Sequence, residues 1–269
     1  MIIRNIASGS SGNATYIGSN NNHILIDSGV SRRRIREGLA KIGLSIRDLN
    51  AILITHEHID HISSLGVLQR TFPIPVYATS GTIEGIRGCS FLGDYDMEVF
   101  QAVSAGDEFE IGDLKVLPLS VSHDAREPVC YRISNGLESF AVVTDLGMYD
   151  EHLLDNLQGL DGILLEANHD IRMLEVGPYP YMLKQRIMGQ RGHLSNESCG
   201  QFLSRLLHDK IQYIMLGHIS KENNTRELAR LAVETEINLA NNGFGASDFE
   251  IHVARRERPS DVFEVRRTP

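Results

Sequence analysis

The stretch Thr55-His56-Glu57-His58-Ile59-Asp60-His61 carries most of the functional information in this sequence. It follows the apolar run Ala51-Ile52-Leu53-Ile54, which predicts a buried strand, so its side chains lie where a strand ends and a helix begins. Imidazole nitrogen and carboxylate oxygen suit zinc, manganese or iron, and the short spacing lets one turn present ligands to two ions. The stretch therefore predicts a metal site, since an Asp that merely caps the next helix would explain none of the three histidines.

Length and charge limit the classes of function. The chain has 269 residues and no visible linker, which predicts one domain over residues 1–269. Its net charge of -9 provides no overall attraction to nucleic acid or acidic membranes, so an anionic substrate would need metal ions or a local basic rim. The sequence contains neither a signal-peptide core nor a membrane-length apolar run, and we therefore expect a cytoplasmic protein with no membrane partner.

Other acids and histidines also follow apolar runs directly. Because a sheet gathers the ends of its strands on one edge, we expect these residues to converge on one site: Asp27, His123, Asp145, Glu166 and His218. Asp27 could brace the metal-binding loop through hydrogen bonds or simply start the next turn. His123 taken alone would more often be structural than a ligand.

Several polar segments are candidates for substrate binding. Ser11 and Asn13 lie in a turn of small residues, which could bind a terminal phosphate or be a plain hairpin. Arg126 follows His123 by three residues and could hold a phosphate. A basic helix over residues 179–189 is expected to supply a local rim through Lys184 and Arg186, with Arg191 beyond it. Another helix is predicted over residues 61–72.

The order of these motifs resembles the metallo-β-lactamase superfamily over essentially the whole chain. That resemblance implies an α/β (α+β) fold, the four-layer αββα sandwich, with two divalent metal ions, zinc or manganese and possibly iron, at the edge of the sheets. It also implies the metal ligands: His56, His58 and His123 for one ion, Asp60, His61 and His218 for the other, and Asp145 between them.

Within the superfamily, two loops resemble those of the tRNA 3′-processing endonucleases and related phosphodiesterases. There a Glu and a His form a proton-donating pair, which corresponds to Glu166 and His193 here. The segments 7–13, 166–170, 192–197 and 220–224 are similar to the bacterial WalJ/YycJ-type subgroup, which is associated with 5′-to-3′ DNA exonuclease activity. The run Ala167-Asn168-His169-Asp170 departs from the endonuclease pattern, so the substrate of those endonucleases does not transfer directly.

The resemblance thus favours a dinuclear-metal phosphodiesterase, a 5′-to-3′ DNA exonuclease that uses a metal-bound hydroxide. The candidate catalytic residues are Asp60, His193 and Glu166, and the candidate substrate-binding residues are Ser11, Asn13, Arg126, His169 and Asn223. The partner would be a nucleic acid, DNA or RNA. The alternatives are an RNA-processing or cyclic-nucleotide phosphodiesterase and a glyoxalase II-like thioesterase. A redox diiron site is disfavoured because the diiron members of the superfamily usually have Glu where this chain has His58. A non-catalytic scaffold is disfavoured because such a protein would be expected to have lost metal ligands, and none is missing from this sequence.

Overall fold

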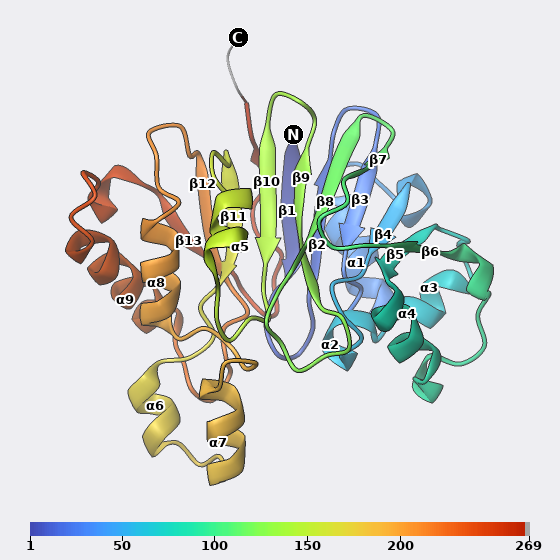
Figure 1. The fold of residues 1–269 in the computed structure, drawn as a ribbon. Helices are drawn as coiled ribbons and strands as arrows, with labels where there is room; N and C mark the ends of the chain where they lie inside the picture. The colour runs from blue at the N-terminus through green and yellow to red at the C-terminus, as the bar shows by residue number, and fades with distance from the viewer. Residues whose placement is uncertain (267–269) are drawn as a thin grey trace. The chain divides into compact units, whose positions relative to one another are not determined.

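The computed structural model describes residues 1–266 (Figure 1). These residues divide into two compact units. Unit 1 comprises Met1–Ser120, Ala125–Glu138 and residues 255–266. Unit 2 comprises Val121–Asp124 and Ser139–Ala254. Each unit is described by itself below, and the expectation of one domain over residues 1–269 stays a prediction.

Unit 1 is built on a seven-stranded mixed sheet in the order β14-β1-β2-β3-β4-β5-β6. The strands β1 to β3 and β14 pair antiparallel, whereas β3 to β6 run parallel. The parallel pairing places the carboxyl ends of β3 and β4 at the same edge. The bounds are β1 Ile2–Ala7, β2 Ala14–Gly18, β3 His23–Ile26, β4 Ala51–Leu53, β5 Val76–Thr79, β6 Phe100–Val103 and β14 Phe263–Glu264.

Helices bury apolar side chains against this sheet. Ile35 and Leu39 of α1 (Arg32–Ala40), Leu68 of α3 (Leu65–Gln69) and Ile86 of α4 (Ser80–Arg87) belong to one buried cluster with strand residues. Burying one such side chain contributes about 1.5–3 kcal/mol, so this cluster holds the strand ends in place. Three 3₁₀ turns, Ile46–Asp48, Ser90–Leu92 and Met97–Val99, and the antiparallel strands β7 Phe109–Ile111, β8 Leu114–Ser120 and β9 Val129–Ser134 complete unit 1.

The helix predicted over residues 61–72 is wrong as a single element. The chain forms two short helices instead, α2 (Ile59–Ile62) and α3, separated by Ser63 and Ser64. The backbone N–H and the hydroxyl of Ser64 both donate to the carbonyl oxygen of Ser28, at 3.0 and 2.9 Å. A serine that bonds elsewhere in this way competes with the helical hydrogen-bond ladder, which explains the break.

Unit 2 contains four parallel strands in the order β10-β11-β12-β13. Their bounds are β10 Ser139–Val143, β11 Gly162–Glu166, β12 Tyr213–Gly217 and β13 Ile251–Val253. Every residue of β10, β11 and β12 is buried, as expected for a parallel sheet covered on both faces. The parallel direction brings the residues that follow β10, β11 and β12 to one edge.

The remaining elements of unit 2 are α5 Glu151–Asn156, α6 Ile171–Val176, α7 Tyr181–Met188, α8 Asn196–Ser204, α9 Arg226–Leu239 and a 3₁₀ turn at Ala246–Asp248. Helices α8 and α9 pack side by side, while α6 and α7 form a pair on the side to which the arrow of β10 points (Figure 1). Among residues 1–266 there is no helix with the length and apolar character needed to cross a bilayer.

Candidate metal-binding and catalytic residues

Asp27 braces the His-rich loop of unit 1. The register pairs Ile26 of β3 with Leu53 of β4, so the residues after the two strands are neighbours. The Oδ1 atom of Asp27 accepts the backbone N–H of Thr55 at 2.9 Å, and its Oδ2 atom lies 2.8 Å from Nδ1 of His61. Of the two interpretations of Asp27, bracing of the loop is the one the structure supports.

His61 is oriented in the manner of a metal ligand. A carboxylate can only accept, so Nδ1 of His61 carries the proton toward Asp27 and the ring directs its Nε2 away from that contact. Nε2 lies 3.6 Å from Oδ2 of Asp60 and 3.0 Å from Nδ2 of Asn13. The rings of His58 and His61 lie 4.6 and 4.1 Å from that of His56, between centroids. Unit 1 thus gathers the four predicted ligands of this loop.

The turn of small residues packs directly against the His-rich loop. The backbone N–H of Asn13 donates to the carbonyl oxygen of Asp60 at 2.8 Å, and Oδ1 of Asn13 accepts from Gly9 at 2.9 Å. A Cβ at Gly29 would lie 1.6 Å from the same Asp60 oxygen, so only glycine fits there. Asn13 is therefore placed beside two predicted ligands, whereas Ser11 is exposed at the tip of the turn.

Arg126 is placed near the same loop but has another partner. Its backbone N–H donates to Oε1 of Glu57 at 2.9 Å, and its guanidinium lies 3.1 Å from Glu84 of α4. Both side chains of that ion pair are more than half exposed, so it is weak and a phosphate could replace Glu84. Glu57 joins the His-rich loop to the segment after His123.

Unit 2 gathers acids and histidines at the carboxyl ends of its parallel strands. Ligand-type atoms of Asp145, Glu166, His193 and His218 all lie within 4.8 Å of one another. Nδ1 of His218 is 2.9 Å from Oδ2 of Asp145 and 3.4 Å from Oε1 of Glu166. Of these four, Asp145 and His218 are predicted ligands, and their oxygen and nitrogen donors fit a divalent metal ion.

Three of the strand-end residues have a left-handed backbone. Asp27, Asp145 and His218 have φ values of 61°, 61° and 51°, and among residues 1–266 the only other non-glycine residue with positive φ is Asn241. This conformation is uncommon outside glycine and costs of order 1–3 kcal/mol where the side chain does not compensate. Such strain is typical of residues that a fold holds in position for a site.

Glu166 and His193, which the resemblance implies as a proton-donating pair, lie in hydrogen-bond contact. Oε1 of Glu166 lies 2.9 Å from Nδ1 of His193, and its Oε2 accepts the backbone N–H groups of Leu146 and Leu194, each at 3.1 Å. Burial opposes protonation of His193, but the adjoining carboxylates of Glu166 and Asp145 outweigh it and raise the pKa of His193. The glutamate is sealed from solvent, while the His193 side chain is 19% exposed.

His123 is also held like a ligand. Its Nδ1 donates to the carbonyl oxygen of Gly192 at 3.0 Å, and its Nε2 faces Oδ1 of Asp145 at 3.9 Å. Burial lowers the pKa of His123, which keeps the ring neutral as coordination requires. In His61 and His123 alike, Nδ1 is bound to a protein oxygen and Nε2 faces a carboxylate. Both units therefore offer donor sets suited to divalent metals.

Two predicted substrate-binding residues of unit 2 are buried polar groups. His169 is 2% exposed, and burial lowers its pKa to about 4, so the ring is neutral at neutral pH. Its Nδ1 and both amide atoms of Asn223 lack a hydrogen-bond partner among the described residues. The backbone N–H of Asp170 donates to the carbonyl oxygen of Asn223 at 2.9 Å, which joins the two loops.

An asparagine network that the sequence did not single out supports this site. Nδ2 of Asn224 donates to the carbonyl oxygens of Ala167 and Asn168 at 2.9 and 3.0 Å, and it exchanges bonds with the side chain of Asn196. Asn168 in turn donates to the carbonyl oxygen of His218 at 2.9 Å. The pair Asn223-Asn224 directly after a strand-end motif was the only signal for this role.

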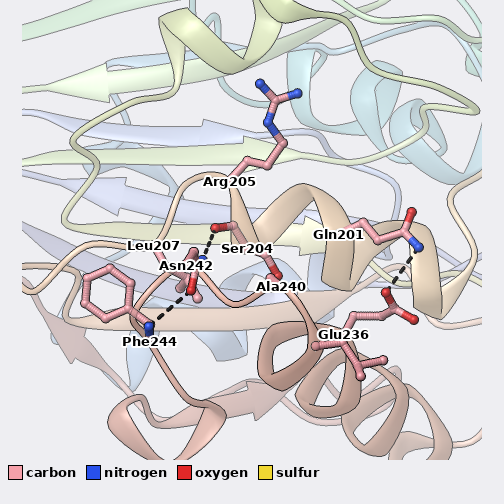
Figure 2. Close-up of a pocket in the computed structure, with 9 residues that line it drawn as sticks. Gln201, Ser204, Arg205, Leu207, Glu236, Ala240, Asn242 and Phe244 are labelled. Carbon is pink, nitrogen blue, oxygen red and sulfur yellow. Dashed lines mark hydrogen bonds between the residues drawn. The ribbon is translucent and has the colours of Figure 1, made fainter.

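A cavity of about 460 Å³ in unit 2 is separate from these residues (Figure 2). It is lined by residues of α8, α9 and the following loop, among them Arg205 and Phe244. Its polar wall groups already bond to one another: Asn242 donates to the carbonyl oxygen of Ser204 at 2.6 Å, and Gln201 to Glu236 at 3.1 Å. These four wall residues are therefore already engaged with one another.

Comparisons with known proteins agree with the sequence interpretation. The model of the metallo-beta-lactamase superfamily matches residues 7–218. The exodeoxyribonuclease WalJ of Streptococcus pneumoniae serotype 2 (strain D39) is 37% identical over 260 residues, covering 97% of this chain and 96% of that protein. The exodeoxyribonuclease YycJ of Bacillus anthracis is 36% identical over 258 residues, covering 96% of each.

A solved structure shows the same fold. The metallo-beta-lactamase fold protein YhfI of Bacillus subtilis superposes with a TM-score of 0.71 at 15% identity, covering 96% of this chain and 98% of that one. At this identity the likeness concerns the fold alone. The predicted fold class, α/β with the sandwich architecture of the metallo-β-lactamase fold, is thereby confirmed.

Proposed function

Because this chain belongs to the metallo-β-lactamase superfamily, we propose that it is a two-metal phosphodiesterase that degrades DNA from a 5′ end. The observation that carries the proposal is the contact between sealed Glu166 and partly exposed His193, 2.9 Å apart. Phosphodiester cleavage needs a proton for the departing alkoxide, and a histidine held by a carboxylate can provide one. Neither β-lactam binding nor thioester binding is suggested by any group described above.

The metal ligands in this proposal are those predicted from the motif order. His56, His58 and His123 would hold one ion, Asp60, His61 and His218 the other, and Asp145 would contact both. Support comes from the family membership and, within each unit, from the orientation of His61 and His123 described above. Two bound divalent ions, zinc or manganese, would acidify water and offset the negative charge that grows on the phosphate. The two units would then work as one hydrolase domain over residues 1–269.

His193 is the proton donor in this mechanism. Its Nδ1–H donates to Glu166, so the proton that it transfers is the one on Nε2. As a hydroxide oxygen from water bonds to phosphorus, the bond between phosphorus and the leaving oxygen breaks, that oxygen takes this proton, and His193 becomes neutral. The backbone N–H groups of Leu146 and Leu194 hold the carboxylate of Glu166 in place against His193. The pair thus positions the donor, and His193, which reaches solvent, takes up a new proton from water before the next turnover.

Substrate choice is proposed from the relatives and from the polar groups near the predicted ligands. The relatives from Streptococcus pneumoniae and Bacillus anthracis described above carry the name exodeoxyribonuclease, which favours DNA over RNA. Ser11, Asn13, Arg126, His169 and Asn223 would bind the substrate, with a terminal phosphate dianion preferred over an internal monoanion because charge-assisted bonds strengthen with acceptor charge.

A time course on DNA labelled separately at each end tests the proposal. The protein, loaded with manganese, should release labelled mononucleotides first from the 5′ label and should prefer a 5′-phosphate to a 5′-hydroxyl. RNA of the same sequence serves as the comparison substrate. Release from the 3′ end first, or equal rates on closed circular DNA, would contradict an exonuclease of this polarity, and faster cleavage of RNA would favour the RNA-processing alternative.

A further inference from the structure

The helix pair α6–α7 of unit 2 exposes an unusual amount of apolar surface. Among residues 1–266, five of the thirteen large exposed hydrophobic residues fall between residues 171 and 188: Ile171, Val176, Tyr181, Met182 and Met188. Val176, Tyr181 and Met182 are 85%, 70% and 76% exposed. Single exposed apolar residues are ordinary, but such a concentration marks a surface that binds something.

The same helix pair is basic in an otherwise acidic protein. Residues 171–192 carry four basic side chains and one acidic one, whereas the whole chain has a net charge of -9. Arg186 pairs with Asp124 and Arg191 donates to the carbonyl oxygen of His123 at 3.1 Å, so these two anchor the helix pair to the segment of a predicted ligand. Arg172 and Lys184 remain on the helices themselves, and Lys184 reaches only a backbone oxygen, that of Glu175.

The end of α7 is attached directly to His193. The backbone N–H of His193 donates to the carbonyl oxygen of Ile187 at 3.0 Å, and the N–H of Gly192 donates to that of Gly189 at 2.8 Å. A Cβ at Gly192 would lie 2.1 Å from the Ile187 oxygen, so only glycine permits this closure. A ligand held on α7 is therefore a few residues away from the proposed proton donor.

We propose that the helix pair α6–α7 binds a single-stranded stretch of the nucleic acid substrate, with the ring of Tyr181 stacked on a base and Lys184 beside the backbone. This inference rests on the proposed function and names the form of substrate that reaches His193. Exposed aromatic rings combined with positive charge are how proteins hold single strands without reading sequence. Aliphatic Val176 and Met182 would flank the stacked base.

The principal rival is a second copy of this chain or another protein docked on the apolar residues. The charge of the helix pair and its attachment to His193 favour the nucleic acid, because a phosphate backbone is neutralised by basic side chains and the substrate must approach His193 in any case. The rival is kept as an outcome of the test.

The test measures kcat and KM on a 5′-phosphorylated single-stranded oligonucleotide and on bis-p-nitrophenyl phosphate, which has no base to stack. Tyr181→Ala should raise KM for the oligonucleotide by about 5- to 150-fold, the range expected for losing one base stack, so the ratio of DNA to small-ester activity falls. Tyr181→Phe should keep KM within about twofold because it keeps the ring, whereas Tyr181→Leu should behave like alanine. Lys184→Gln should reduce the slope of log KM against log salt concentration by about 0.7.

Leu231→Ala, at a 60% exposed position on α9, is the matched control and should change kcat and KM on neither substrate. If Tyr181→Ala cleaves DNA with the KM of the wild type, the helix-pair proposal is wrong and the proposed function still stands. Hydrolysis of the small ester without any DNA cleavage would reject the proposed function itself. Sedimentation tests the rival. If the wild type is a dimer and Val176→Asp is a monomer with the same KM for the oligonucleotide, the helix pair is an interface between copies of this chain.

Discussion

Each unit contains a carboxylate at the end of a strand that holds the Nδ1 atom of a histidine. In unit 1 Asp27 lies 2.8 Å from His61, and in unit 2 Glu166 lies 2.9 Å from His193. Both carboxylates also accept backbone N–H groups from the neighbouring loop. The chemistry of the two pairs is the same, but the burial of the histidine is not.

His61 is 0% exposed, with Asn13 beside its Nε2, whereas His193 is 19% exposed. A sealed imidazole cannot exchange protons with a substrate but keeps a fixed lone pair, as a ligand needs. An imidazole that reaches solvent can pass on a proton. The comparison indicates that exposure, more than the hydrogen-bond partner, distinguishes an orienting pair from a proton-transferring one. The predictions below test this distinction.

Replacing the exposed histidine should have the largest effect. His193→Ala should lower kcat on DNA by about 10²–10⁴, the usual contribution of a general acid, because the departing alkoxide loses its proton donor. The bound metal, measured by elemental analysis, should stay at the wild-type level. The loss should be smaller on an aryl ester, whose leaving group needs no proton. Equal losses on aryl and alkyl phosphodiesters would show that His193 positions the substrate instead.

Removing the charge of Asp27, in the sealed pair, should weaken metal binding and leave the rate of the chemical step unchanged. Asp27→Asn should weaken metal affinity by about 10- to 100-fold, the typical cost of losing a partner that orients a ligand. A chelator competition measures the affinity, and kcat at saturating metal should stay near the wild-type value. Asp150→Asn, which keeps the cap of α5, is the matched control. A large fall in kcat with unchanged affinity would mean that the Asp27–His61 pair also transfers protons.

The smallest effect should come from Arg126, which belongs to neither pair. Arg126→Ala should narrow the preference for a 5′-phosphate over a 5′-hydroxyl by about two- to fivefold, since the contact is exposed and shared with Glu84. The measurement compares KM on oligonucleotides with the two ends. Arg230→Ala, which breaks a similar exposed pair with Glu234 on α9, should leave the preference intact. An unchanged preference in Arg126→Ala would remove this residue from the phosphate site.

The strand-end residues could be predicted because apolar runs mark strands and the acid or histidine that follows each run is visible in the sequence. Asp27 shows the limit of such prediction. The sequence left open whether it braces the loop, since the answer depends on the parallel register of β3 and β4. The break between α2 and α3 was missed for the same reason, because Ser64 bonds to Ser28, a residue 36 positions earlier.

The role of Asn224 could not be predicted either. It bonds to residues 56 and 57 positions away, and an asparagine in a loop ordinarily indicates a turn. The exposure that separates His193 from His61 is likewise a property of the folded chain. Sequence therefore identifies the chemical groups of this site, and tertiary contacts assign their tasks.

The left-handed backbone at Asp27, Asp145 and His218 has a consequence for laboratory evolution. Glycine adopts this conformation without strain, but it would also remove the buried hydrogen bonds that the Asp27 and Asp145 carboxylates accept. At Asp145 and His218 such a replacement would delete a proposed metal ligand, and at Asp27 it would delete the carboxylate that orients His61. Relief of backbone strain and the proposed metal site therefore compete at the same three residues, so stabilising substitutions are expected elsewhere in the chain.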